Sequence, residues 1–189
     1  AKAGIEPAMV EQMIGGCVTQ AGEQSNNVTR NAWLSRGGDW TVAGSTVDTQ
    51  CGSSQQANHL VSALIKAGQI DVGIACGVEV MSRGAYLSPQ MRNGARMGDV
   101  KMIDSMVATL TDPFGVGHMG ITAENLTAKW NITREQQDAL AVESHRRAAR
   151  ATDEGRFDAE IVPVPVTTDD GDTVFAHDEG IRRDSSVEK

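Results

Sequence analysis

The amino-acid sequence predicts a fold of the α/β class, and three segments of the chain carry this prediction. Residues 8–18 are mostly apolar and end at a Gly-Gly pair, which is typical of a strand that runs into a turn. Residues 57–65 repeat apolar side chains at positions i, i+3, i+4, i+7 and i+8, which predicts an amphipathic helix ending near Gly68. Residues 70–78 form a nearly continuous apolar run, which predicts a central strand covered on both faces.

Two further segments complete this alternation. Residues 22–38 predict a helix, because asparagine and serine lie near its start and a glycine pair stops it. Residues 45–50 predict a short extended piece in front of the amphipathic helix. Strands and helices therefore alternate up to about residue 80, as in an α/β layer.

The character of the chain changes after residue 80. Residues 82–118 are rich in glycine, proline and methionine, which predicts an irregular region interrupted by a short helix over residues 101–110. Two longer helices follow, and the second begins with Thr133 and Gln136 in the spacing of a capping box. These two helices are predicted over residues 122–130 and 133–155, and extended pieces over residues 160–166 and 172–178.

Composition limits the classes of function. With 189 residues the chain is long enough for one domain with a substantial core, or for one domain that carries a large insertion. Its net charge of −8 argues against a nucleic-acid partner, and no apolar run is long enough for a membrane span. Three cysteines without a paired CxxC spacing favour a reducing, cytoplasmic location. The first and last residues look unnatural for a complete protein, so we expect a fragment.

Cys51 is the candidate nucleophile. It stands where a predicted strand turns into a predicted helix, and the unpaired N–H groups and dipole of a helix N-terminus stabilise a thiolate. The same N–H groups can stabilise an oxyanion on an acyl group attached to the sulfur. Against this, free cysteines are often small buried hydrophobes. Placement alone leaves both readings open.

A nucleophilic cysteine needs a base, and four histidines are available. His59 lies eight residues further along the same predicted helix, roughly 12 Å away, and is excluded. His145 is predicted on the surface of a polar helix and His177 in a charged loop, whereas His118 lies in a Gly-rich setting that faces a pocket or is structural. The residues therefore predict a nucleophile without a convincing base.

Other chemistries find no support in the sequence. Motifs for phosphate loops, dinucleotide binding and zinc or clustered metal ligands are absent, so no metal site is predicted. The neighbouring carboxylates of Asp169 and Asp170 fall in a stretch typical of a turn.

Five segments of the chain resemble the thiolase family, the acetyl-CoA acetyltransferases and 3-ketoacyl-CoA thiolases, in family order. The first surrounds Cys51 and resembles the segment of the family's acyl-accepting cysteine. The segments read "VDTQCGSSQQANHLVSALIKAGQIDVGIACGVEVMS", "GARMGDVKMIDSM", "GHMGITAEN", "REQQDALAVESHRRAARATDEGRFDAEIVPV" and "DEGIRRDSS".

This resemblance implies a layered αβαβα fold, of which the chain holds part of the N-terminal half and an inserted loop domain. Residues 1–80 would be the partial N-terminal α/β domain with the nucleophile helix, and residues 81–189 an incomplete, CoA-binding loop domain. The family's catalytic histidine, second cysteine and water-positioning asparagine belong to its second domain, and no segment here matches them. Lys189 stands where some members carry a CoA-contacting serine.

The resemblance also implies roles for individual residues. Cys51 would accept the acyl group, and its backbone N–H would be one donor of an oxyanion hole. Leu110, His118 and Met119 would line the pantetheine and acyl pocket. Arg182 would lie near the adenine nucleotide of coenzyme A, where an acidic protein needs local positive charge.

The implied function is that of an acyl-CoA C-acyltransferase, which forms or cleaves acetoacetyl-CoA or another 3-ketoacyl-CoA through a Cys51 acyl-enzyme. Coenzyme A and its thioesters would be the substrates, with no further cofactor, and the protein would form a homodimer or homotetramer. The alternatives are a non-catalytic fragment that binds CoA or dimerises, a longer-chain 3-ketoacyl-CoA thiolase, or a related ketoacyl synthase. We expect a chain limited to these residues to be inactive.

Overall fold

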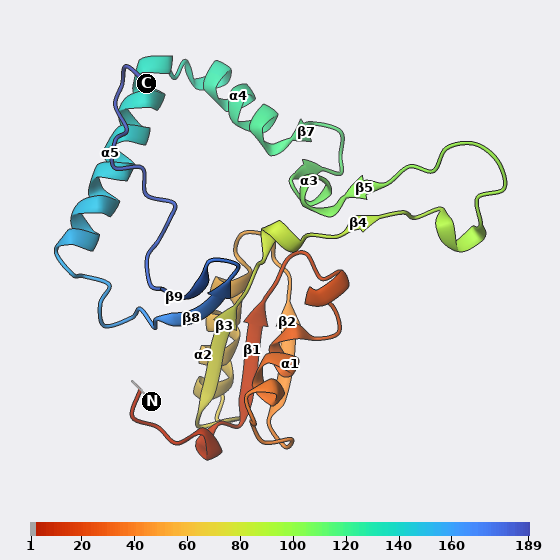
Figure 1. Cartoon of the computed structure of the whole chain (residues 1–189), viewed down its shortest axis with the longest axis vertical. Helices are drawn as coiled ribbons and strands as arrows, with labels where there is room; N and C mark the ends of the chain where they lie inside the picture. The colour runs from red at the N-terminus through yellow and green to blue at the C-terminus, as the bar shows by residue number, and fades with distance from the viewer. Residues whose placement is uncertain (1–2) are drawn as a thin grey trace. The chain divides into compact units, whose positions relative to one another are not determined.

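The structure is a computed structural model that describes residues 3–189. The chain divides into two compact units, Ala1–Thr122 and Ala123–Lys189, and each is described by itself (Figure 1). The domain boundary expected near residue 80 falls within the first unit and stays a prediction. No helix within residues 3–189 combines the length and the apolar character that crossing a membrane requires.

The first unit is built on a parallel three-stranded sheet. Strands β1 (Gln12–Gly16), β2 (Ala43–Val47) and β3 (Gly73–Gly77) lie in the order β2-β1-β3, with β1 in the centre (Figure 1). Helix α1 (Val28–Ser35) connects β1 to β2, and helix α2 (Ser53–Lys66) connects β2 to β3. Parallel strands joined by helices confirm the α/β class predicted from the sequence.

The two helices cover opposite faces of this sheet. Met13 and the α1 residue Trp33 belong to one apolar cluster, whereas Ile14 packs with Ala57 and Val61 of α2 in a second cluster. Neighbouring residues of β1 thus point to opposite faces, as the pleat of a strand requires. Right-handed crossovers explain the arrangement, because the step from β1 to β2 and the step back from β2 to β3 run in opposite directions along the sheet.

The strand predicted over residues 70–78 is confirmed as β3 (Gly73–Gly77), but the described residues do not show it in the centre of the sheet. Within residues 3–189, β3 pairs only with β1 and lies at the edge of the sheet. Both of its faces are nevertheless covered, because Ile74 and Cys76 pack with the first cluster and Ala75 with the second. A continuous apolar run indicates that both faces of a strand are covered. It does not indicate whether the strand lies in the centre or at the edge of the sheet, because helices can cover both faces in either position.

The helix predicted over residues 22–38 is shorter than expected. Residues Gly22–Gln24 form a single 3₁₀ turn, and α1 starts only at Val28. Asn26 and Asn27 between them adopt left-handed backbone conformations, with φ of 58° and 56°. Asparagine tolerates this conformation better than most residues, so the chain turns here instead of continuing a helix.

The rest of the first unit consists of short elements, as the composition of residues 82–118 predicts. The predicted short helix is α3 (Ser105–Thr109), and Asp104 caps it by accepting a hydrogen bond from the Met106 N–H at 2.9 Å. The other elements are the 3₁₀ turns Pro7–Met9, Met81–Arg83 and Met91–Asn93, the antiparallel pair β4 (Tyr86–Leu87) and β5 (Ile103–Asp104), and the antiparallel pair β6 (Thr111–Asp112) and β7 (Gly117–His118).

The later part of the chain contains two helices and a hairpin. Helix α4 spans Met119–Trp130, and α5 spans Arg134–Asp153. The predicted capping box is present, because the Gln136 N–H donates to Thr133 Oγ1 and the Thr133 N–H donates to Gln136 Oε1. Strands β8 (Val164–Thr168) and β9 (Gly171–Phe175) form an antiparallel hairpin, and its turn holds Asp169 and Asp170 as predicted.

Candidate active site

A pocket of about 450 Å³ opens in the first unit where the three parallel strands end. Three groups of residues at the ends of these strands line it: Gly16, Cys17, Val18 and Thr19 at the end of β1, Gln50, Cys51, Ser53 and Ser54 after β2, and Gly77, Val78, Glu79 and Met81 at the end of β3. All three strands are parallel, so their carboxyl ends meet at one edge of the sheet. This edge is where open α/β sheets bind their ligands.

Cys51 lies in this pocket at the start of α2. Its side chain is exposed, and the next residue, Gly52, is the N-cap of the helix. Gln50 directly before it adopts a left-handed conformation with φ of 50°, so the chain turns sharply into the helix. The positive end of the α2 dipole is therefore adjacent to the sulfur, and it stabilises a negative charge there.

Ser53 holds this turn in shape. Its buried hydroxyl accepts a hydrogen bond from the Thr49 N–H at 3.0 Å and donates one to the Gln50 carbonyl at 2.6 Å. These bonds fix the backbone on both sides of the left-handed residue. Ser53 therefore has a structural role at this turn.

Gly16 lets the helix come close to the sheet. A Cβ atom at Gly16 would lie 2.4 Å from the backbone carbonyl carbon of Ser53, closer than any real contact. The end of β1 thus touches the first turn of α2 directly. Gly15 and Gly16, the pair predicted to end the strand in a turn, are instead the last two paired residues of β1, and Gly16 is required for this packing.

The three cysteines differ in their surroundings. Burial raises the pKa of Cys17, and the carboxylates of Glu79 and Asp48 raise it further; burial also raises the pKa of Cys76. Cys51 alone of these three is exposed. Cys17 lines the same pocket as Cys51, although its side chain is almost fully buried. This proximity could not be predicted from the sequence, because 34 positions separate the two residues.

Two of the residues implied by the family resemblance join Cys51 in this pocket. Leu110 and Met119 both line it, and the Met119 N–H donates to the Leu110 carbonyl at 2.8 Å across the β6–β7 hairpin. His118 is exposed and is not among the lining residues; its Nδ1 accepts the Gly120 N–H at 3.1 Å. The role of His118 as a pocket wall stays a prediction. No histidine among residues 3–189 lines this pocket.

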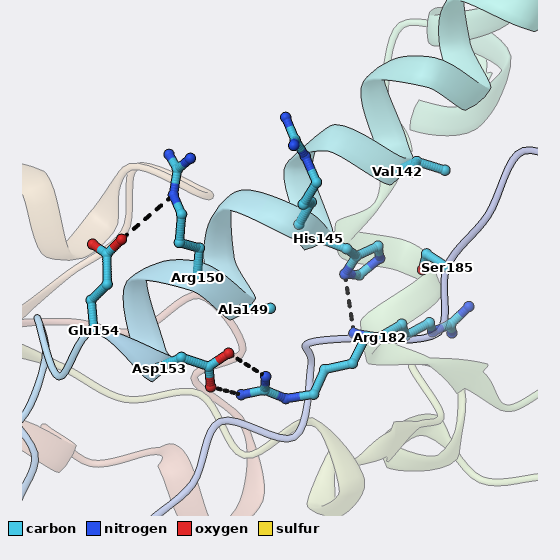
Figure 2. A pocket seen from close by; sticks show the side chains of 10 residues that line it. Val142, His145, Ala149, Arg150, Asp153, Glu154, Arg182 and Ser185 are labelled. Carbon is cyan, nitrogen blue, oxygen red and sulfur yellow. Dashed lines mark hydrogen bonds and ion pairs between the residues drawn. The ribbon is translucent and has the colours of Figure 1, made fainter.

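Arg182 belongs to the second unit, where it lines a separate pocket of about 530 Å³ between α5 and the segment that follows β9 (Figure 2). The Arg182 N–H donates to His145 Nδ1 at 3.1 Å. His145, predicted on the helix surface, is therefore half-buried, because this later segment covers that side of α5.

This second pocket is rich in positive charge. Its lining holds Arg146, Arg150, Arg182 and Arg183 against two carboxylates, those of Asp153 and Glu154. Arg183 pairs with Asp153 at 2.9 Å, and Figure 2 shows Arg182 extending away from that pair. An anionic group such as a phosphate fits a surface of this charge. Within residues 3–189, no cluster of His, Cys, Asp and Glu is arranged to hold a metal ion.

Comparisons with known proteins agree with this architecture. Residues 1–189 match the family described as "Thiolase, N-terminal domain". The chain is 42% identical over 189 residues to an acetyl-CoA acetyltransferase of Chromobacterium violaceum, covering 99% of this chain and 48% of that protein. It is 43% identical over 188 residues to a probable acetyl-CoA acyltransferase of Staphylococcus aureus, covering 98% and 48%.

Solved structures give the same result. The acetyl-CoA acetyltransferase from Syntrophomonas wolfei superposes with a TM-score of 0.89 at 36% identity, covering 98% of this chain and 47% of that chain. The enzyme of the same name from Bacillus anthracis superposes with a TM-score of 0.90 at 38% identity and the same coverage. The chain thus spans about half the length of these relatives. It belongs to the thiolase family.

Proposed function

We propose that the protein is an acyl-CoA C-acyltransferase that forms or cleaves a 3-ketoacyl-CoA through an acyl-enzyme on Cys51. The observation that carries this proposal is the position of Cys51, exposed at the N-terminus of α2 in a pocket where three parallel strands end. Membership of the thiolase family supports it. The chain covers about half of its relatives, so the activity is proposed for the whole protein.

The proposed reaction divides into two steps. In the first, the Cys51 thiolate attacks the thioester carbonyl of an acyl-CoA, and the C–S bond to coenzyme A breaks. Coenzyme A leaves and takes up a proton, and the acyl group stays on Cys51. In the second step, the enolate of another acyl-CoA attacks this new thioester, releases the Cys51 thiolate and forms the 3-ketoacyl-CoA. The reverse sequence is thiolytic cleavage, and both directions are covalent catalysis with ping-pong kinetics.

Two features of the first unit suit these steps. The dipole of α2 stabilises both the attacking thiolate and the oxyanion formed on the carbonyl. The apolar side chains of Leu110, Met106 and Met119 line the pocket and shield the acyl-enzyme from water. In the second unit, the arginine-rich pocket around Arg182 supplies cations for the phosphate groups of coenzyme A.

The proposal is tested by incubating the full-length protein with acetyl-CoA, stopping it with acid, and mapping acetylated peptides by mass spectrometry. We expect acetylation on Cys51 and its loss in Cys51→Ser. Cys76→Ser is the matched control, since this half-buried strand residue lies outside the pocket lining. Acetylation that persists in Cys51→Ser at an unchanged rate would sink the assignment.

The acyl group carried by the substrate has two candidates. The names of the relatives favour acetyl transfer and acetoacetyl-CoA. The size of the pocket and its three methionines, Met81, Met106 and Met119, favour a longer acyl chain, because methionine adapts to irregular apolar ligands. The ratio of kcat/KM for thiolysis of acetoacetyl-CoA and of a 3-ketoacyl-CoA with an eight-carbon chain decides between them.

A further inference from the structure

The backbone pairing between β1 and β3 ends at the mouth of the Cys51 pocket. Gly16 and Gly77 are the last paired residues, and the Val78 N–H still donates to the Gly16 carbonyl at 3.0 Å. On the β1 side, the N–H of Cys17 donates to the carbonyl of Val47, the last residue of β2, at 3.1 Å. The following N–H groups, those of Val18 and Thr19, bond to a side chain instead of a neighbouring strand.

The carboxylate of Glu79 binds the backbone just beyond the end of β1. Glu79 Oε2 accepts the N–H of Val18 at 2.8 Å, and Glu79 Oε1 accepts the N–H of Thr19 at 3.2 Å. The side chain of a residue that follows β3 thus binds two backbone donors that follow β1. It keeps the two segments together where the strand pairing no longer does.

Gln24 completes this network from the 3₁₀ turn before α1. Its amide nitrogen donates to Glu79 Oε1 at 3.0 Å and to the Thr19 carbonyl at 2.8 Å, while its amide oxygen accepts the Val80 N–H at 2.6 Å. The Gln24 side chain is buried, with only 7% of its surface exposed. Each polar atom of this buried amide has a partner, which makes the network rigid. We call it the Glu79–Gln24 clamp.

The clamp depends on a charged acceptor. Burial raises the pKa of Glu79, but the N–H donors of Val18, Gln24 and Thr19 lower it by more, so that it lies below its ordinary value. Hydrogen bonds to an ionised carboxylate are roughly twice as strong as those between neutral groups. An amide in place of this carboxylate turns one acceptor oxygen into a donor, which then faces an N–H.

The clamp forms part of the wall beside Cys51. Cys17, Val18, Thr19 and Glu79 all line the pocket that holds Cys51. Within residues 3–189, Glu79 makes no hydrogen bond to Cys51, and we assign its effect on the reaction to the position of the wall. A displacement of about 1 Å in such a wall is enough to slow a reaction about a hundredfold.

We propose that Glu79 is a positioning residue for acyl transfer to Cys51. Its ionised side chain, together with Gln24, holds the Val18–Thr19 segment against the segment after β3 and sets the space in which the thioester carbonyl approaches Cys51. This inference rests on the function proposed above for Cys51. Glu79 itself exchanges no proton and touches no reacting atom in this role.

The test compares Glu79→Gln with a matched control in the full-length protein. Glu23→Gln removes the same charge from a neighbouring exposed residue that pairs with Arg83 and takes no part in the clamp. We expect Glu79→Gln to slow the acetylation of Cys51 by acetyl-CoA at least about tenfold, the scale of one lost charged hydrogen bond. Glu23→Gln should stay within about twofold of the unchanged protein.

Cysteine labelling separates a shifted wall from general unfolding. Cys17 is almost fully buried in this wall, whereas Cys76 lies on β3 and packs with the apolar cluster that contains Met13. In Glu79→Gln we expect iodoacetamide to modify Cys17 faster, because the wall opens and because the Glu79 carboxylate no longer raises the Cys17 pKa. The labelling rates of Cys76 and Cys51 should stay within about twofold. The rate at Cys51 should change little with iodoacetamide, because this small reagent requires only an accessible sulfur. Acetyl-CoA must also fit the pocket around the sulfur, so its reaction depends on the position of the wall.

Two further variants keep the test decisive if Glu79→Gln does not fold. Gln24→Glu removes the amide donor and places a second carboxylate beside the first, so it should slow acetylation as Glu79→Gln does. Glu79→Asp keeps the charge and should recover part of the rate. The inference is overturned if both clamp variants acetylate Cys51 within twofold of the unchanged protein. If the unchanged protein itself shows no acetylation of Cys51, the proposed function fails instead.

Discussion

At the scale of single residues, exposure and a position at a helix N-terminus distinguish Cys51 from the other two cysteines. Iodoacetamide reacts with the thiolate, and only Cys51 combines an exposed sulfur with a helix N-terminus. Burial raises the pKa of Cys17 and of Cys76, which disfavours their thiolates. Brief labelling at pH 7 followed by peptide mass spectrometry should find Cys51 modified first. Faster modification of Cys76 would contradict the choice of nucleophile.

In the second unit, Arg182 lines the arginine-rich pocket and is expected to contact coenzyme A. Arg182→Ala should raise the KM for CoA substrates and leave kcat nearly unchanged, because a contact to a non-reacting part of the substrate contributes equally to ground state and transition state. Steady-state kinetics of the full-length protein measure both constants. Arg134→Ala is the control, since Arg134 pairs with Asp138 at the other end of α5 and does not line the pocket. An unchanged KM would remove Arg182 from the site.

At the scale of elements, the contact between β1 and the first turn of α2 determines where Cys51 stands. Gly16→Ala inserts a methyl group 2.4 Å from the Ser53 backbone, and the helix or the strand must move. We expect a loss of about 1–3 kcal/mol in the free energy of unfolding, the usual cost of overpacking, measured by urea denaturation. Gly52→Ala is the control, because its nearest contact would be an ordinary 3.4 Å from the Thr49 carbonyl oxygen. Equal stability of the two variants would show that this close contact is absent.

At the scale of the whole molecule, the described residues hold the proposed nucleophile, Cys51, but place no histidine in its pocket. Condensation needs a base to form the enolate, and proton transfer by a placed group contributes roughly 10²–10⁴-fold. A polypeptide limited to residues 1–189 should therefore show no measurable thiolysis of acetoacetyl-CoA beside the full-length enzyme. Turnover within tenfold of full length would contradict this and would make His118 the first residue to mutate.

The sequence by itself determined the features that depend on neighbouring residues. The apolar periodicity of residues 57–65 predicted α2, the Thr133–Gln136 spacing predicted a capping box, and the place of Cys51 between an extended piece and a helix pointed to a nucleophile. Each of these signals spans at most a few helical turns, and local propensity and hydrogen bonding decide such features.

Only the tertiary structure decided which distant segments meet. The partners of Glu79 lie 55 to 61 positions away along the chain, and no periodicity connects them. The edge position of β3 depends on which strand pairs with β1, whereas its apolar run reports only that both faces are covered. His145 became a partner of Arg182 because a later segment packs on α5. Such contacts depend on the path by which the chain crosses from one layer to the next. The composition and periodicity of a single segment do not indicate that path.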